Sequence, residues 1–144
     1  MFFANRKEHA IPFFIQTKIL PMSLLYFLSL SKLMHDVYNK KTPTNISKLF
    51  HLTSTVHSYN TRSSSKNDIY IQKFNLESSR KSIPISGGKL WNGIPSSVRD
   101  LPKKQFQQKI VSILLQILND QDTYINAANI INVVNRFIIT RHII

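Results

Sequence analysis

The chain has 144 residues, a length typical of one domain, and its 19 Lys and Arg against seven Asp and Glu give a formal net charge of +12. It has no cysteine, which excludes disulfide frameworks and thiolate metal sites and fits a reducing compartment, the cytoplasm or the nucleus. The charge is concentrated in residues 61–110, with ten basic and three acidic residues, and it favours an anionic partner, either a nucleic acid or an anionic membrane surface.

Two helices are expected near the start of the chain. Apolar residues recur at helical spacing after Pro21, and proline suits the first turn of a helix because its missing N–H would be unpaired there. This pattern predicts a helix over residues 22–39, preceded by a shorter helix over residues 12–19. Pro43 ends the longer helix, because the residue before a proline is pushed out of the α region.

The apolar run over residues 11–33 raises the question of a membrane segment. A spanning helix needs about 20 mostly apolar residues. Gln16, Lys18 and Pro21 interrupt this run, so no transmembrane segment is expected. An amphipathic anchor on a membrane surface stays open as an alternative.

The middle of the chain predicts a loop and a small β-hairpin. Residues 53–67 are rich in Ser, Thr, Asn and basic residues without apolar periodicity, which is typical of a loop. Residues 68–74 alternate in a way that suits a strand, and residues 82–85 could pair with it. Gly87-Gly88 would supply a turn or a close backbone approach. The expected fold class is therefore α+β, mainly helical with a small antiparallel β-hairpin.

The strongest helix prediction covers residues 103–119. Pro95 and Pro102 each suit the first turn of a helix, and the second is followed by one wide apolar face. That face consists of Phe106, Ile110, Ile113, Leu114, Ile117 and Leu118. Residues 1–120 are expected to form a single basic domain, and residues 121–144 an apolar tail whose periodicity does not decide its structure.

The pattern of acidic and histidine residues does not predict an enzyme. Nucleotidyl transfer with two metal ions needs clustered carboxylates. The acidic residues are instead scattered: Glu8, Asp36, Asp68, Glu77, Asp100, Asp120 and Asp122. The histidines are isolated as well, so we expect no catalytic residue, no metal site and no cofactor.

Binding chemistry remains, since aromatic and basic residues interleave across the loop, the expected strand and the start of the last helix. Such a mixture suits the stacking of bases and the tracking of phosphates, although packed tyrosines and solvated lysines would give the same pattern. The candidate nucleic-acid-binding residues are Tyr59, Arg62, Lys66, Lys73, Arg80, Lys81, Lys89, Lys103 and Lys104. Trp91, Pro95 and Phe106 are expected to be structural, with the Trp91 indole filling the core between strand and helix.

Several short motifs occur in a fixed order over residues 9–126. They are Ile-Leu-Pro-x-x-Leu-Leu-Tyr at residues 19–26, His-x-Tyr-Asn-Thr-Arg at 57–62, Leu-Trp-Asn-x-Ile-Pro at 90–95 and Arg-x-Leu-Pro at 99–102. In this order they resemble the C-terminal tail of non-LTR retrotransposon reverse transcriptases, which are RNA-directed DNA polymerases of mobile elements. Each motif is short, and their order and spacing together carry the resemblance.

The resemblance implies a role in holding template RNA or target DNA beside a polymerase core, which would be a further partner. The catalytic aspartates of that family belong to a palm region that would precede these motifs, so no catalytic residue can be carried over. The sequence thus predicts a nucleic-acid-binding accessory segment that is not catalytic by itself. A non-functional remnant of a mobile element is the alternative.

Overall fold

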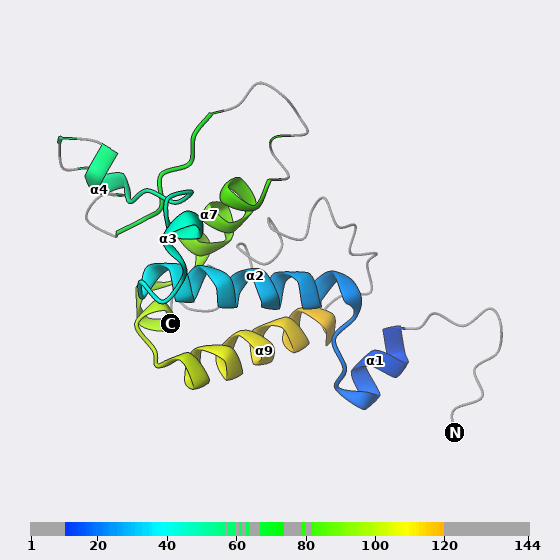
Figure 1. Cartoon of the computed structure of the whole chain (residues 1–144). Coiled ribbons are helices and arrows are strands. Elements are labelled where there is room, and N and C mark those ends of the chain that lie inside the picture. The colour runs from blue at the N-terminus through cyan, green and yellow to red at the C-terminus, as the bar shows by residue number, and fades with distance from the viewer. Residues whose placement is uncertain are drawn as a thin grey trace.

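The computed structural model describes residues 11–56, 58–59, 61, 63, 67–73, 79 and 82–119. The two long helices of this part, α2 (Met22–Tyr38) and α9 (Lys103–Asn119), run side by side, and α7 (Ile83–Gly93) packs against α2 (Figure 1). The shorter helices are α1 (Ile11–Thr17), α3 (Thr44–Ser47), α4 (Thr53–Val56) and α8 (Ser96–Arg99). The mainly helical character expected from the sequence is therefore confirmed.

Helix α2 begins where the sequence places it. Pro21 is its N-cap residue, and the Pro21 carbonyl accepts the backbone N–H groups of Leu24 and Leu25. The residues buried on one side of α2 are Leu24, Phe27, Leu30, Ser31, Met34 and His35. Their spacing of three and four residues is that of one helical face turned to the core.

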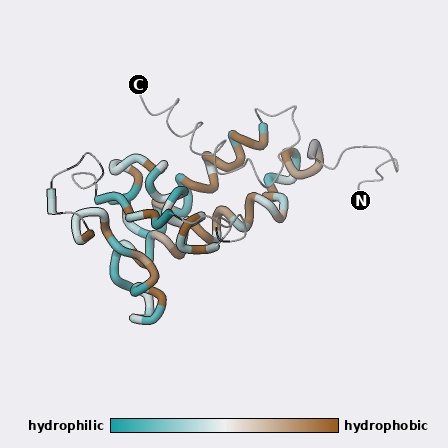
Figure 2. The backbone as a smooth tube through the Cα atoms, turned by 90° about the horizontal axis from the view of Figure 1, so that it is seen from above, coloured by the Kyte–Doolittle hydropathy of each residue, from teal (hydrophilic) through white to brown (hydrophobic). Residues whose placement is uncertain are grey.

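Helix α9 supplies the opposite wall of the core. The apolar face predicted for residues 103–119 is buried over its whole length, from Phe106 to Leu118. Figure 2 shows the resulting alternation of hydrophobic and hydrophilic stretches along the helices. Pro95 and Pro102 directly precede α8 and α9, so each proline lies at the helix start that the sequence indicates.

The expected β-hairpin is wrong. Residues 82–85 do not form a strand, because Ser82 is the N-cap residue of α7 and Pro84 lies in its first turn, where a proline needs no N–H partner. Residues 67–73 contribute a single antiparallel bridge, between Ile69 and Leu52, and no other strand pairing occurs in the described part of the chain. The residues that were expected to pair with segment 68–74 thus form the start of α7.

Gly87 and Gly88 lie inside α7, where they allow a close approach rather than a turn. A Cβ atom on Gly87 would lie 2.6 Å from Met34 Sδ of α2, and one on Gly88 would lie 3.2 Å from Ile71 Cγ1. Glycine in a helix interior costs about 1 kcal/mol relative to alanine. The packing of α7 against α2 and against residues 67–73 overrides that propensity.

The closer of these contacts leads to a test. Gly87→Ala is expected to destabilise the protein by about 1–2 kcal/mol, because overpacking a filled core outweighs the gain in helix propensity. Gly88→Ala, whose contact is longer, should cost less. Urea denaturation of both variants measures the difference, and a Gly87→Ala protein more stable than the parent would contradict the tight approach.

The predicted loop over residues 53–67 begins with a helical turn. Thr53–Val56 form α4, and the Thr55 hydroxyl donates to the Leu52 carbonyl.

Within the described residues, no helix is long and apolar enough to cross a bilayer.

Candidate functional site

The centre of the described structure is an aromatic cluster around Trp91. Trp91 and Phe106 are both completely buried, with ring centroids 6.0 Å apart. The His35 ring lies 4.5 Å from that of Phe106, and its Nε2 donates a hydrogen bond of 3.0 Å to the Leu101 carbonyl. The Tyr38 ring completes the cluster, 5.1 Å from Trp91. Trp91 therefore joins α2, α7 and α9, rather than a strand and a helix as the sequence suggested.

Asn92, the next residue, holds the extended segment 67–73 in place. The Ile69 N–H donates to Asn92 Oδ1 and Asn92 Nδ2 donates to the Ile69 carbonyl, each at 2.8 Å. The opposite edge of the segment is paired with backbone, since the Tyr70 N–H donates to the His51 carbonyl and the Thr53 N–H to the Asp68 carbonyl. The Asn92 side chain thus takes the place of a neighbouring strand and satisfies backbone groups that would otherwise be unpaired.

Arg99 anchors the same segment through a buried ion pair. Its Nη2 lies 2.9 Å from Asp68 Oδ1, and the Arg99 side chain is only 4% exposed. The guanidinium also donates to the carbonyls of Ile94 and Asn92, and it lies 5.6 Å from the centre of the Trp91 ring. The sequence did not single out these structural roles of Asp68, Asn92 and Arg99, although the last two belong to its motifs.

This anchored segment forms one wall of a groove that we call the tyrosine groove. The groove has a volume of about 310 Å³. Its lining residues are Thr53, Tyr59, Thr61, Ser63, Ile69, Tyr70, Ile71 and Asn92. Tyr59 is 64% exposed and Tyr70 is 36% exposed, and Lys73 follows on the same segment with an exposed side chain. Exposed aromatic rings beside hydroxyls and a cation can stack on a planar ligand and bind a phosphate.

The remaining candidate binding residues that the structure describes lie in different parts of the molecule. Lys103 forms an ion pair with Asp36 at 2.8 Å, Lys104 lines a second groove along α9, and Lys89 is exposed on α7. None of these lysines lines the tyrosine groove. Four of the predicted residues lie outside the described residues: Arg62, Lys66, Arg80 and Lys81.

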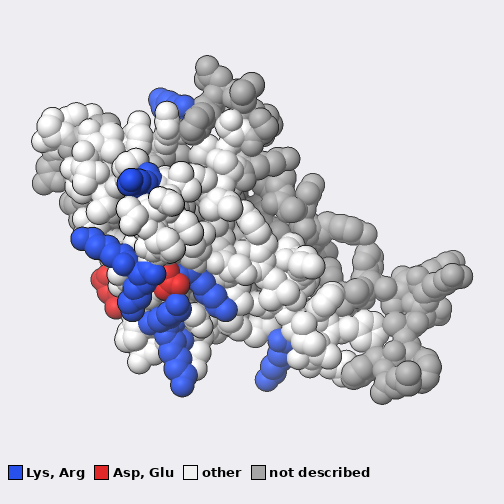
Figure 3. Space-filling model, viewed as in Figure 1, with Lys and Arg blue, Asp and Glu red and all other residues white. Residues whose placement is uncertain are grey.

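Basic side chains nevertheless gather at one end of the molecule. On the face drawn in Figure 3, Lys and Arg side chains cluster over the region where α2 ends and α9 begins. The cluster surrounds a small acidic area, in keeping with the pair of Lys103 and Asp36. This end of the molecule is suited to an anionic ligand.

The described part of the chain contains no candidate metal site. Among those residues, no group of three or more His, Asp or Glu side chains is placed to hold a metal ion. Two of the described carboxylates form ion pairs, Asp68 with Arg99 and Asp36 with Lys103.

Comparison of the chain with protein-family models, with curated proteins and with solved structures gives no match. The resemblance to retrotransposon reverse transcriptases is thus carried by the sequence motifs alone. The structure adds a physical role for several of the motif residues, which build the core and hold the wall of the tyrosine groove.

Proposed function

We propose that this protein is a nucleic-acid-binding accessory segment, similar to the C-terminal segment of a non-LTR retrotransposon reverse transcriptase and not catalytic by itself. The observation that carries the proposal is the tyrosine groove, which Tyr59 and Tyr70 line with exposed side chains and which Lys73 follows along the chain, three residues after Tyr70. The net charge of +12 and the order of the motifs support it. The protein would act in the cytoplasm or nucleus, with RNA or DNA and with a polymerase core as partners.

The groove favours single strands over duplexes. The stacking of a base on an aromatic side chain contributes about 1–3 kcal/mol and tolerates any base, because every base has a π-face. A paired base inside a duplex offers its face only to its neighbours. The net charge of +12 adds a sequence-independent attraction to phosphates through the release of counterions.

In this proposal the motif residues Asn92 and Arg99 hold one wall of the tyrosine groove in place. Asn92 binds the backbone of Ile69 and Arg99 binds the side chain of Asp68, and these contacts fix the residues just before Tyr70. A ring held on a rigid segment loses little conformational freedom on binding, so its stacking is more favourable. The core motifs and the binding surface are thus parts of one arrangement.

Tyr59 provides the direct test. Tyr59→Ala is expected to weaken the binding of a single-stranded oligonucleotide about tenfold, because one stacked base is lost. The matched control is Tyr26→Ala, since Tyr26 is 46% exposed on α2 and does not line the groove. Fluorescence anisotropy measures binding, and circular dichroism checks that both variants melt like the parent.

The results separate the proposal from its alternatives. Equal affinities for the two variants would mean that the tyrosine groove does not bind nucleic acid. A parent protein without measurable affinity for RNA or DNA would overturn the proposal as a whole. A parent without a cooperative melt would favour a non-functional remnant.

A membrane-surface role is the second candidate, and one observation favours it. The outer side of α2 and the residues before it expose an apolar stripe made of Ile19, Met22, Leu25 and Tyr26, with Met22 83% exposed. Such a stripe can enter the interface of an anionic bilayer, and nearby lysines can meet its headgroups. In flotation with phosphatidylserine vesicles this role requires Tyr26→Ala to reduce binding and Tyr59→Ala to leave it unchanged.

A further inference from the structure

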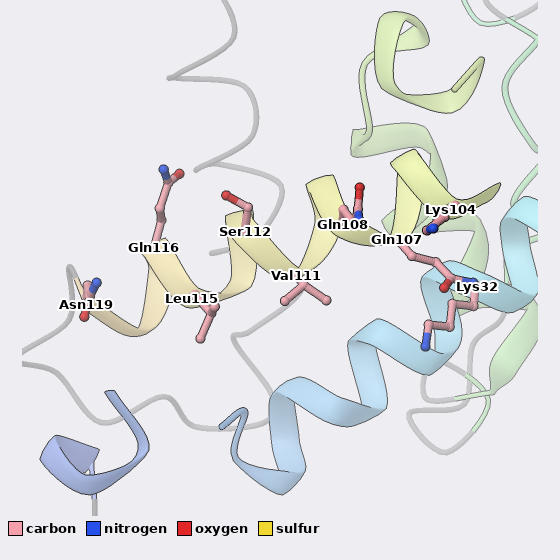
Figure 4. Close-up of a pocket in the computed structure, with 9 residues that line it drawn as sticks. All are labelled: Lys32, Lys104, Gln107, Gln108, Val111, Ser112, Leu115, Gln116 and Asn119. Atoms are coloured by element: carbon pink, nitrogen blue, oxygen red, sulfur yellow. The ribbon is translucent and has the colours of Figure 1, made fainter. Parts of the chain in front are cut away.

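The described structure contains a second and larger groove, which lies along α9. Its volume is about 650 Å³, and all its described lining residues belong to α9 except Lys32 of α2 (Figure 4). Neither the sequence motifs nor the tyrosine groove involves this surface. Among the candidate binding residues that the structure describes, Lys104 alone lines it.

The side chains of this groove form two rows. Lys104, Gln108, Ser112 and Gln116 are spaced by four residues, which places them on one continuous ridge of the helix. Figure 4 shows Gln108, Ser112 and Gln116 pointing away from α2, whereas Val111 and Leu115 lie on the side of α2. We call the first row the amide ridge.

The amide ridge has a distinct chemistry. None of the described residues that line the groove is acidic, and Lys32 and Lys104 lie at one end of it. Asn and Gln can donate and accept hydrogen bonds at the same time, and with Lys and Ser they are the residue types that read base edges. The groove therefore combines cations for phosphates with amides for bases.

The dimensions of the ridge suit an extended ligand. At 1.5 Å per residue, the ridge from Lys104 to Gln116 spans roughly 18 Å. Neighbouring phosphates on one strand of a duplex lie about 3.4 Å apart along the axis, so the ridge could follow about five base-pair steps. An exposed helix side of this kind can lie against a nucleic acid without any change in the core.

We infer that the amide ridge of α9 is a second nucleic-acid contact, in which Lys104 and Lys32 bind phosphates and Gln108, Ser112 and Gln116 form hydrogen bonds with bases. This inference rests on the proposed function and extends it to a surface separate from the tyrosine groove. Lys104 belongs to the same row as the amide residues, and Lys32 lines the groove from α2. The two kinds of side chain therefore leave different signatures in a binding measurement.

The lysine contacts are tested by the salt dependence of binding. Lys104→Gln in the full chain should flatten the log–log salt slope by about 0.7 for a single strand or 0.9 for a duplex, the value for one lost phosphate contact. Lys109→Gln is the matched control, because Lys109 is exposed on the same helix but does not line the groove. Equal flattening by the two variants would mean diffuse attraction and would overturn the lysine assignment.

The amides are tested by comparing the affinity at one salt concentration and the salt slope. The double variant Gln108→Ala/Gln116→Ala should weaken binding about tenfold without changing the salt slope, because hydrogen bonds to bases release no counterions. Alanine is the best helix former, so α9 is preserved, and circular dichroism verifies this. Gln105→Ala is the control, since Gln105 is exposed on α9 outside the groove.

Four probes complete the experiment: single-stranded and duplex forms of RNA and of DNA, with a polyglutamate peptide as competitor. Unchanged affinity of the double variant, with Tyr59→Ala still weakened, would overturn this inference and leave the proposed function in place. Competition by polyglutamate as strong as by the oligonucleotide would also overturn it, since charge alone would then explain binding. A parent chain that binds none of the four probes would remove both.

Discussion

Replacement of Trp91 by alanine is expected to lower the free energy of unfolding by about 3–5 kcal/mol, the range for removing a large aromatic side chain from a core. Trp91 is completely buried and packs against His35, Tyr38 and Phe106, so its removal leaves a cavity where α2, α7 and α9 meet. Domains of this size are stable by only about 5–15 kcal/mol. The loss is therefore a large share of the total stability, and urea denaturation should show a clearly lower unfolding midpoint.

Trp91→Phe is the informative companion variant. The Trp91 indole Nε1 is buried without a hydrogen-bond partner in the described structure, and an unsatisfied donor costs free energy. Phenylalanine removes that donor and keeps most of the packing, so its loss should be well below that of alanine. A Trp91→Ala protein that melts like the parent but loses nucleic-acid binding would instead make Trp91 a stacking residue.

The helical core could be predicted from the sequence because its signals are local. The burial of α2 and α9 follows directly from apolar residues spaced by three and four, and the starts of both helices follow from Pro21 and Pro102. Periodicity and proline placement act within a few residues. They therefore need no knowledge of the partners in the fold.

The β-hairpin failed for the opposite reason. The sequence left Gly87-Gly88 open between a turn and a close backbone approach, and the choice depends on Met34 and Ile71, which lie far away in sequence. Segment 67–73 likewise pairs with the Asn92 amide on one edge and with the backbone of residues 51–53 on the other, and not with residues 82–85. A side chain that replaces a strand leaves no alternating pattern, so sequence periodicity could not reveal it.

The candidate site was predictable only in part. Interleaved tyrosines and cations directed attention to Tyr59 and Lys73, which lie in or near the tyrosine groove. The amide ridge gave no such signal, because Gln and Ser on the outer side of α9 look like any solvated helix face. Only the shape of the groove and the position of Lys32 beside it distinguish that surface.

The ion pair between Asp68 and Arg99 carries the second large effect. Asp68→Asn keeps the shape of the side chain but removes the negative charge that lies 2.9 Å from the buried Arg99 guanidinium, which also donates to the Ile94 and Asn92 carbonyls. Breaking a buried pair by removing one partner costs about 3–5 kcal/mol, because the attraction that offset the burial of the other charge is lost. Thermal and urea unfolding should both show the loss.

The matched control is the second ion pair of the described residues. Lys103 is 49% exposed and pairs with Asp36, so solvent screens the attraction and Lys103→Gln should cost at most about 1 kcal/mol. Equal losses for Asp68→Asn and Lys103→Gln would show that burial does not strengthen the Asp68–Arg99 contact.

A double-mutant cycle measures the interaction between Asp68 and Arg99 directly. Arg99→Met alone should also destabilise strongly, since it leaves the Asp68 carboxylate without its cation and the Ile94 carbonyl without a donor. The combined variant Asp68→Asn/Arg99→Met should be destabilised by less than the sum of the two single losses, because neither buried charge is then left alone. Strict additivity would contradict a direct interaction. Because the Asp68 carboxylate also accepts a hydrogen bond from the hydroxyl of Ser63, which lines the tyrosine groove, Asp68→Asn should weaken oligonucleotide binding even at temperatures where the variant is still folded.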